Sequence, residues 1–140
     1  MDEAAKSRVY KSFAAQSLMR TLGAELLEVS PGLVRIAAPI LPIALQQQGF
    51  GHAGLTFSIG DSAAGYAALS LMPLDLEVVT AEIKINLLAP ARGDRLIATG
   101  RVLKAGRRLS VVASDVHAET AEGLVHVAVL QGSMMPVPLG

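Results

Sequence analysis

Cysteine is absent from the 140-residue sequence, and charged residues make up only 17% of it. Without cysteine the chain can form no disulfide bond, no thiolate nucleophile and no cysteine-ligated metal site. Basic and acidic residues number 12 each, so the net charge is zero and the pI lies near 6.8. Because there is neither a basic excess nor an acidic tail, we expect no nucleic-acid partner.

A long uncharged run occurs once. Ala53–Met72 contains a single charged residue, Asp61, and is long enough to cross a bilayer. A charge near the middle of a membrane span is costly, and much of the segment is Gly, Ala and Ser, so we expect no membrane association. The acidic start Met1–Glu3 lacks the order of a signal peptide. We therefore expect a cytoplasmic protein.

Hydrophobic residues, in contrast, make up 51% of the chain. This fraction excludes disorder, which requires low hydrophobicity and high net charge. The length fits one domain, residues 1–140. The apolar content exceeds what one subunit of this size needs for its core, so we expect subunits to associate.

Helix and turn signals divide the first half of the chain. Apolar residues recur at helical spacing within Ser7–Met19, which predicts an N-terminal helix in residues 1–20. Pro and Gly in Ser30–Gly32 mark a tight turn, which predicts a β-hairpin. The expected strands of this hairpin are 22–28 and 33–40. A polar loop then leads to His52.

Residues 53–72 form the predicted central helix. Its apolar residues surround the helix rather than following one stripe, so it must be buried on all sides. Several Gly and Ala residues allow a sheet to approach it closely. Pro73 ends the pattern.

The rest of the chain predicts β-strands joined by short turns. The expected strands are 77–88, 95–103, 109–119 and 124–134. Successive strands with short turns indicate an antiparallel meander. An all-round apolar helix is best buried when such a sheet curls around it. The sequence therefore predicts an α+β hotdog fold, an antiparallel β-sheet wrapped around a central buried α-helix.

Three segments then resemble the signature of PaaI-type hotdog thioesterases. In Gln46–Gly65 a loop with a polar amide leads to Gly51-His52-Ala53-Gly54 and then to a helix with the pattern Asp-x-x-x-Gly. Asp61 lies nine residues after His52, as in the family. In Ile83–Asp94 an alternating strand ends in Pro90 and a Gly-Asp turn, and Gly106-Arg107-Arg108 resembles a further family turn. The resemblance covers about residues 20–135 and implies hydrolysis of an acyl-CoA thioester, without a cofactor.

Asp61 is the candidate general base or nucleophile. Desolvation on an apolar helix raises the pKa of a carboxyl group and makes the carboxylate a better base. The alternative is a structural Asp that binds a hydroxyl or caps a distorted turn. The family spacing favours the catalytic role.

The resemblance assigns supporting roles to five further positions. The backbone N–H groups of Ala53 and Gly54 lie at the helix N-terminus and could hold the thioester oxygen as its negative charge develops; the resemblance gives this role to Ala53. Gln46 would orient the water or the thiolate, Thr80 would position the water, and His52 would support the loop. Three positions depart from the family, which usually has Gly, Asn and Ser where this chain has Ala53, Gln46 and Thr80. Loop polarity or β-propensity alone could also explain Gln46 and Thr80.

Cations at predicted turns could bind the phosphates of CoA. Arg92, Arg107 and Arg108, together with Lys104, are the candidates, because arginine suits bidentate phosphate contact. Ordinary solvated turn charges explain them equally well. No carboxylate–histidine cluster has metal-ligand spacing, so we expect no metal.

The resemblance also implies a homodimer that assembles into a homotetramer, with Asp61 facing Gln46 and Ala53 of the partner. The competing hypothesis is a non-catalytic acyl-CoA binding or sensing module on the same fold, because fold alone does not establish a reaction. A hotdog hydratase is a weaker third hypothesis, since its loop motif is missing. The identity of the acyl group lies beyond the sequence.

Overall fold

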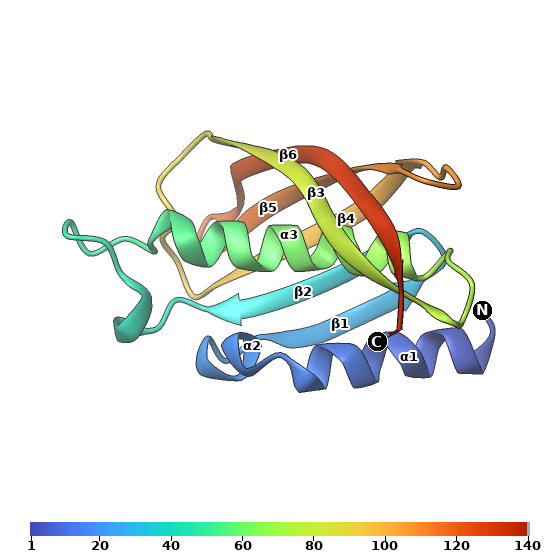
Figure 1. Ribbon diagram of the computed structural model, residues 1–140. Coiled ribbons are helices and arrows are strands. Elements are labelled where there is room, and N and C mark those ends of the chain that lie inside the picture. Colours follow the sequence, from blue (N-terminus) through green and yellow to red (C-terminus); the bar gives the residue numbers. More distant parts are fainter. Residues whose placement is uncertain (140) are drawn as a thin grey trace.

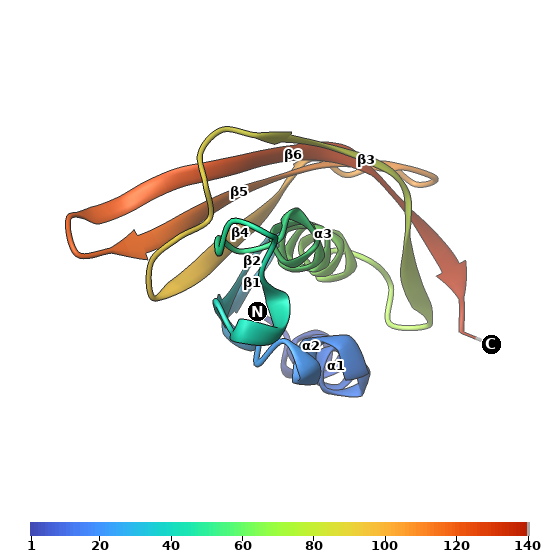
Figure 2. The same ribbon diagram turned by 90° about the vertical axis from the view of Figure 1, so that its left-hand side faces the viewer.

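A long helix lies along the concave side of a curved antiparallel sheet in the computed structural model, which describes residues 1–139 (Figures 1 and 2). The architecture is the predicted α+β hotdog fold. The helices are α1 (Glu3–Ala15), α2 (Ser17–Thr21) and α3 (Ala53–Leu69), with a 3-10 turn at Pro42–Ala44. The strands are β1 (Glu25–Ser30), β2 (Leu33–Pro39), β3 (Leu76–Leu87), β4 (Arg95–Lys104), β5 (Ser110–Thr120) and β6 (Gly123–Pro138).

The central helix α3 is buried on most sides, as its all-round apolar pattern predicts. Small residues bring it close to the sheet: Gly100 on β4 touches the helix backbone so closely that a Cβ there would overlap the carbonyl of Ala63. The Ser114 hydroxyl on β5 donates to the carbonyl of Gly60 at 2.7 Å. These contacts fix the position of α3, and hence of Asp61, relative to the sheet.

Helix α3 ends at Leu69, three residues before the predicted end at Met72. The Arg8 guanidinium explains this early end, because it donates to the carbonyls of Leu69 at 2.6 Å and Met72 at 2.8 Å, and also binds that of Pro73. Carbonyls at a helix C-terminus lack partners within the helix, and Arg8 supplies them. The N-terminal helix is thus tied to the end of the central one.

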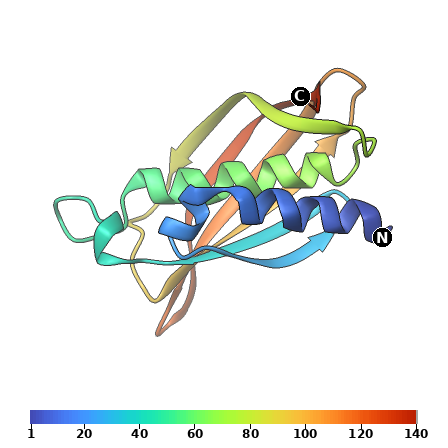
Figure 3. The same ribbon diagram turned by 60° about the horizontal axis from the view of Figure 1, so that its bottom comes forward.

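The predicted continuous N-terminal helix is interrupted. Gln16 adopts an extended conformation between α1 and α2, with φ −79° and ψ 104°. Its side chain leaves the helix direction to donate to the Tyr66 hydroxyl of α3 at 2.6 Å. Figure 3 shows α1 running alongside α3. This break therefore turns a polar side chain toward the central helix.

The sheet order is β1-β2-β4-β5-β6-β3, which corrects the predicted four-strand meander. Strands β4, β5 and β6 do follow one another as expected, but β3 pairs with β6 and not with β4. The segment 88–94 is therefore a crossover and not a hairpin turn. The alternation of polar and apolar residues predicts a strand and its two faces, but it does not show which other strands pair with it. As a result β3 lies at an edge of the sheet, with no neighbouring strand on its outer side among the described residues.

None of the helices in the described part of the chain has the length and hydrophobicity needed to span a membrane. The segment that matched a membrane span by length is α3, and it lies under the sheet.

Candidate active site

Asp61 lies in the middle of α3, on the side of the helix that faces β3. Its carboxylate is half-buried and accepts a hydrogen bond of 2.8 Å from the Thr80 hydroxyl of β3. Burial raises the pKa of the Asp61 carboxyl above its ordinary value, and the Thr80 hydrogen bond lowers it in part. The predicted pair is thus brought together, with the carboxylate partly desolvated.

A cavity of about 190 Å³ opens beside this carboxylate, and we call it the Asp61 cavity. It is bounded by α1, α3, β3 and β6. Its lining residues are Ser12, Gln16, Asp61, Ser62, Gly65, Tyr66, Glu77, Val78, Thr80 and Met134. Most of these side chains are polar, which is unusual for a space beside a buried helix.

Five of these polar residues were not predicted from the sequence: Ser12, Gln16, Ser62, Tyr66 and Glu77. Ser12, in α1, hydrogen-bonds to the Tyr66 hydroxyl at 3.0 Å, and Gln16, the C-cap of α1, does so at 2.6 Å. Burial raises the pKa of Tyr66, and the bonds to Ser12 and Gln16 lower it in part. A tyrosine on an otherwise apolar helix needs a partner for its hydroxyl when buried. That need was the available signal, although the partners could not be named from it.

The N-terminus of α3 forms the second part of the candidate site. The His52 side chain is the N-cap, and its Nδ1 accepts from the N–H of Gly54 at 2.7 Å. The Gly54 N–H is therefore occupied within the chain. The N–H of Ala53, the first helical residue, finds no acceptor among residues 1–139. Ala53 is thus the donor left free at this helix end, while His52 orders the chain around it.

A larger cavity of about 470 Å³ lies at this helix end, and we call it the loop cavity. Gln46, Gln48, Phe50, His52 and Ala53 line one side of it, and residues 87–91 line the other. The Gln46 carboxamide oxygen accepts from the backbone N–H groups of Gln48 and Phe50, so this side chain holds the loop in shape.

Within one chain the two parts of the site do not meet. The loop cavity and the Asp61 cavity share no lining residue. Ala53 and Asp61 are eight residues apart on one helix, which corresponds to about 12 Å along its axis. A base and an oxyanion donor must both lie within about 3 Å of the reacting groups. One chain therefore cannot offer both groups to the same carbonyl.

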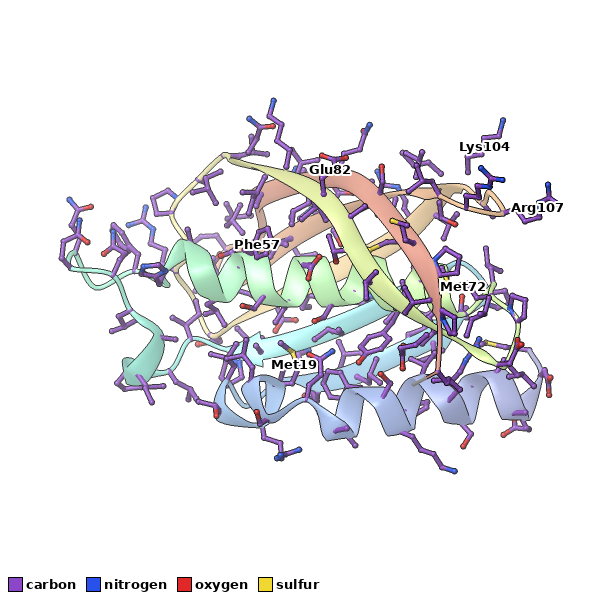
Figure 4. All side chains as sticks on the ribbon, viewed as in Figure 1. Met19, Phe57, Met72, Glu82, Lys104 and Arg107 are labelled. Atoms are coloured by element: carbon purple, nitrogen blue, oxygen red, sulfur yellow. The ribbon has the colours of Figure 1, made fainter. Side chains whose placement is uncertain are left out.

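The arginines expected near CoA are not clustered. Arg92 lies beside the loop cavity, with its guanidinium carbon 5.5 Å from the centre of the Phe50 ring. Arg107 and Arg108 lie in the turn after β4, whereas Arg92 precedes that strand. A ten-residue strand separates its ends by about 33 Å. Figure 4 shows Lys104 and Arg107 at the far end of the sheet from the residue 46–50 loop.

The strand histidines lie away from both cavities. His117 and His126 stack with ring centres 4.6 Å apart, and His126 lies 3.0 Å from the carboxylate of Asp115. Residues 1–139 contain no group of three or more potential ligands placed to hold a metal ion.

Comparison with known proteins identifies the family. The family model described as the thioesterase superfamily matches residues 48–124, which include α3 and its preceding loop. A candidate esterase of Deinococcus radiodurans is 35% identical over 103 residues, covering 73% of this chain and 68% of the relative.

Solved structures agree with this assignment. A thioesterase family protein from Silicibacter pomeroyi is 37% identical, with a TM-score of 0.94 over 96% of this chain and 99% of the other. The PaaI protein of the E. coli phenylacetic acid degradation operon shares the fold at 22% identity, with a TM-score of 0.83 over 98% and 94% of the two chains. The chain therefore belongs to the thioesterase superfamily, and the resemblance to PaaI-type hotdog proteins expected from its sequence is confirmed.

Proposed function

We propose that this protein hydrolyses an acyl-CoA thioester to the free acid and CoA, with Asp61 as the general base or nucleophile. The observation that carries the proposal is a half-buried carboxylate, held by Thr80, that opens onto a cavity of acyl-group size. A raised pKa makes a carboxylate a better proton acceptor. In the base mechanism Asp61 takes a proton from water, and the hydroxide adds to the thioester carbon. The C–S bond then breaks and the thiolate leaves.

The Ala53 N–H is the proposed oxyanion donor. It is the donor left without an acceptor at the start of α3, where the helix dipole also favours negative charge. Because the backbone donates, the Ala side chain in place of the family Gly leaves this role intact. Gly54 contributes indirectly, since its N–H secures the His52 cap.

We propose that the working site is shared between two subunits. The separation of about 12 Å between Ala53 and Asp61 supports this, because the two groups of one chain are too far apart to act on the same thioester. Within residues 1–139 no strand pairs with the outer edge of β3, which exposes Val79 and Leu87, as an edge that pairs with a second copy would. Asp61 of one subunit would then face Ala53 and Gln46 of the partner subunit. Assembly of two such dimers into a tetramer, in the cytoplasm, completes the proposal.

CoA would approach through the loop cavity, with Arg92 available to its phosphates. This exposed guanidinium lies beside Phe50 at that cavity, which supports the role. Arg107 and Arg108 could reach a CoA only if another subunit brought them to it, because they lie at the opposite end of β4.

The test of the reaction is thiol release from a panel of acyl-CoAs of different length, including phenylacetyl- and benzoyl-CoA. We expect turnover of at least one member, lost in Asp61→Asn. Tight binding without turnover across the panel would instead support the non-catalytic sensing module.

A subunit-mixing experiment tests the shared site. Ala53→Pro removes only the N–H, and proline is favoured at the first position of a helix. Losing one oxyanion donor costs about 100- to 1000-fold in kcat. When inactive Ala53→Pro and Asp61→Asn subunits are mixed under exchange conditions, about a quarter of wild-type activity should return, because half of the subunit pairs carry one intact site. No recovery after demonstrated exchange would contradict the shared site.

A further inference from the structure

The wall of the Asp61 cavity opposite β3 carries more hydrogen-bond donors than its own contacts use. Gln16 donates one amide hydrogen to Tyr66, and its oxygen accepts from Ser62 at 3.4 Å. A single hydrogen bond joins the Ser12 and Tyr66 hydroxyls, so only one of these two hydroxyl hydrogens is used in it. An amide has two hydrogens and each hydroxyl has one. One amide hydrogen and one hydroxyl hydrogen are therefore left over in this wall.

These donors face a cavity that is open to solvent on one side, and Ser12 and Gln16 are half-buried. Tyr66 is only 3% exposed, and Ser12, Gln16, Ser62 and Tyr66 all line the cavity. Among residues 1–139, no further side-chain acceptor contacts the Tyr66 hydroxyl. A donor that a bound acyl group shields from water without giving it an acceptor costs about 1–3 kcal/mol, so an acyl group that supplies an acceptor there is favoured. Burial keeps this tyrosine protonated, which preserves its ability to donate.

The cavity also limits the size and the charge of the group that it can hold. A space of 150 Å³ is enough for a benzene molecule, so the 190 Å³ beside Asp61 suits one ring or a chain of about six carbons. Asp61 and Glu77 both line it and would repel an anionic group. Tyr66 lies five residues beyond Asp61, which places the donor wall about 7 Å further along the helix. That distance corresponds to the far end of such a chain.

From this arrangement we propose that the Asp61 cavity is the acyl pocket, and that Ser12, Gln16 and Tyr66 select a compact, uncharged acyl group with a hydrogen-bond acceptor at its far end. This inference rests on the proposed hydrolysis and extends it to the substrate class. It assigns the N-terminal helix a direct part in specificity, although the family model begins only at residue 48.

The test compares hexanoyl-CoA with 5-oxohexanoyl-CoA, which differ by one carbonyl acceptor near the chain end. We expect the wild type to favour the oxo substrate by about tenfold in kcat/KM, the effect of one satisfied donor. Adipyl-CoA, which ends in a carboxylate, should be at least tenfold poorer than the oxo substrate. A wild-type ratio near one, or equal turnover of adipyl-CoA, would overturn the proposal.

Two variants test which side chains cause the preference for the oxo substrate. The double substitution Ser12→Ala with Tyr66→Phe removes both hydroxyls, and the oxo-to-hexanoyl ratio should fall at least threefold. Tyr10→Phe is the matched control, because Tyr10 lies on α1 but is 42% exposed and lines none of the Asp61 cavity. Its ratio should equal that of the wild type. An unchanged ratio in the double variant would refute the role of this wall.

Binding measurements test the pocket assignment independently of the proposed reaction. Calorimetry with non-hydrolysable thioether analogues of the same two chains measures the preference without turnover. If no acyl-CoA is hydrolysed but the oxo analogue binds about tenfold more tightly, the reaction fails and the pocket assignment stands. If hydrolysis occurs but both analogues bind equally, the reaction stands and the pocket assignment fails. The double variant should lose the binding preference even if it folds less stably, and circular dichroism checks that it folds.

Discussion

Replacing Asp61 with Asn removes one negative charge and almost nothing else. The Asn carboxamide has the shape of the carboxylate, and its oxygen can still accept the hydrogen bond that Thr80 donates at 2.8 Å. The environment of the side chain should therefore be preserved. What is lost is the ability to accept a proton from water or to attack the thioester.

The expected loss in kcat is about 100- to 10,000-fold, the scale of general-base catalysis, or about 3–5 kcal/mol of transition-state stabilisation. KM should change little, because Asn fills the same space in the cavity. The assay is continuous thiol release from the best acyl-CoA of the panel. Turnover within about tenfold of the wild type would refute the assignment of Asp61 as base or nucleophile.

The stability of Asp61→Asn should not fall with its activity; it should stay equal to that of the wild type or rise. Because burial raises the pKa of Asp61, the folded state holds the proton more tightly than the unfolded state. The ionised carboxylate therefore lowers the free energy of unfolding above the folded-state pKa, and this cost disappears as the pH falls below the unfolded-state value. Asp61→Asn carries no such cost. Its Tm should equal or exceed that of the wild type at neutral pH, with the difference vanishing in acid.

Four other substitutions test the site and the packing of α3. Thr80→Val removes the hydrogen bond that lowers the carboxylate pKa, so the acid limb of the kcat/KM profile should move to higher pH. Gly65→Ala should raise the free energy of unfolding by about 1 kcal/mol through helix propensity. The matched Gly60→Ala should not, because its Cβ would stand 2.8 Å from Leu130; equal gains in thermal melts would contradict the packing. Arg8→Met should lower the free energy of unfolding by about 2–3 kcal/mol, because it leaves helix-end carbonyls unpaired, and urea titration would measure this.

The sequence alone was sufficient to predict the buried central helix and to single out Asp61 as an unusual residue on it. An all-round apolar pattern requires burial on all sides, and a lone carboxylate in such a pattern needs a reason. The turn at Ser30–Gly32 also followed from local chemistry, since it needs a residue with positive φ and Gly32 has φ +73°. These features depend on neighbouring residues in the chain, which a sequence displays directly.

Features that depend on distant segments were not predictable. The position of β3 at the edge of the sheet follows from its pairing with β6, and no periodicity records a partner. Gln16 appeared to be an ordinary helical residue until its contact with Tyr66, 50 residues later, was known. The sequence also could not show that a whole strand separates Arg92 from Arg107 and Arg108 within one chain, and their role at the phosphates of CoA stays a prediction.

The pairing of β3 with β6 has a consequence for the order in which the protein becomes active during synthesis. Thr80 lies on β3, and the only strand that pairs with β3 in the described sheet is β6, which is synthesised after all the other described elements. Contacts between segments so far apart in sequence form slowly. The hydrogen bond that orients the Asp61 carboxylate can therefore be secured only after β6 has emerged. A nascent chain that has already buried α3 against β2, β4 and β5 would still lack the Asp61–Thr80 contact, so the proposed site would form only once β6 has paired with β3.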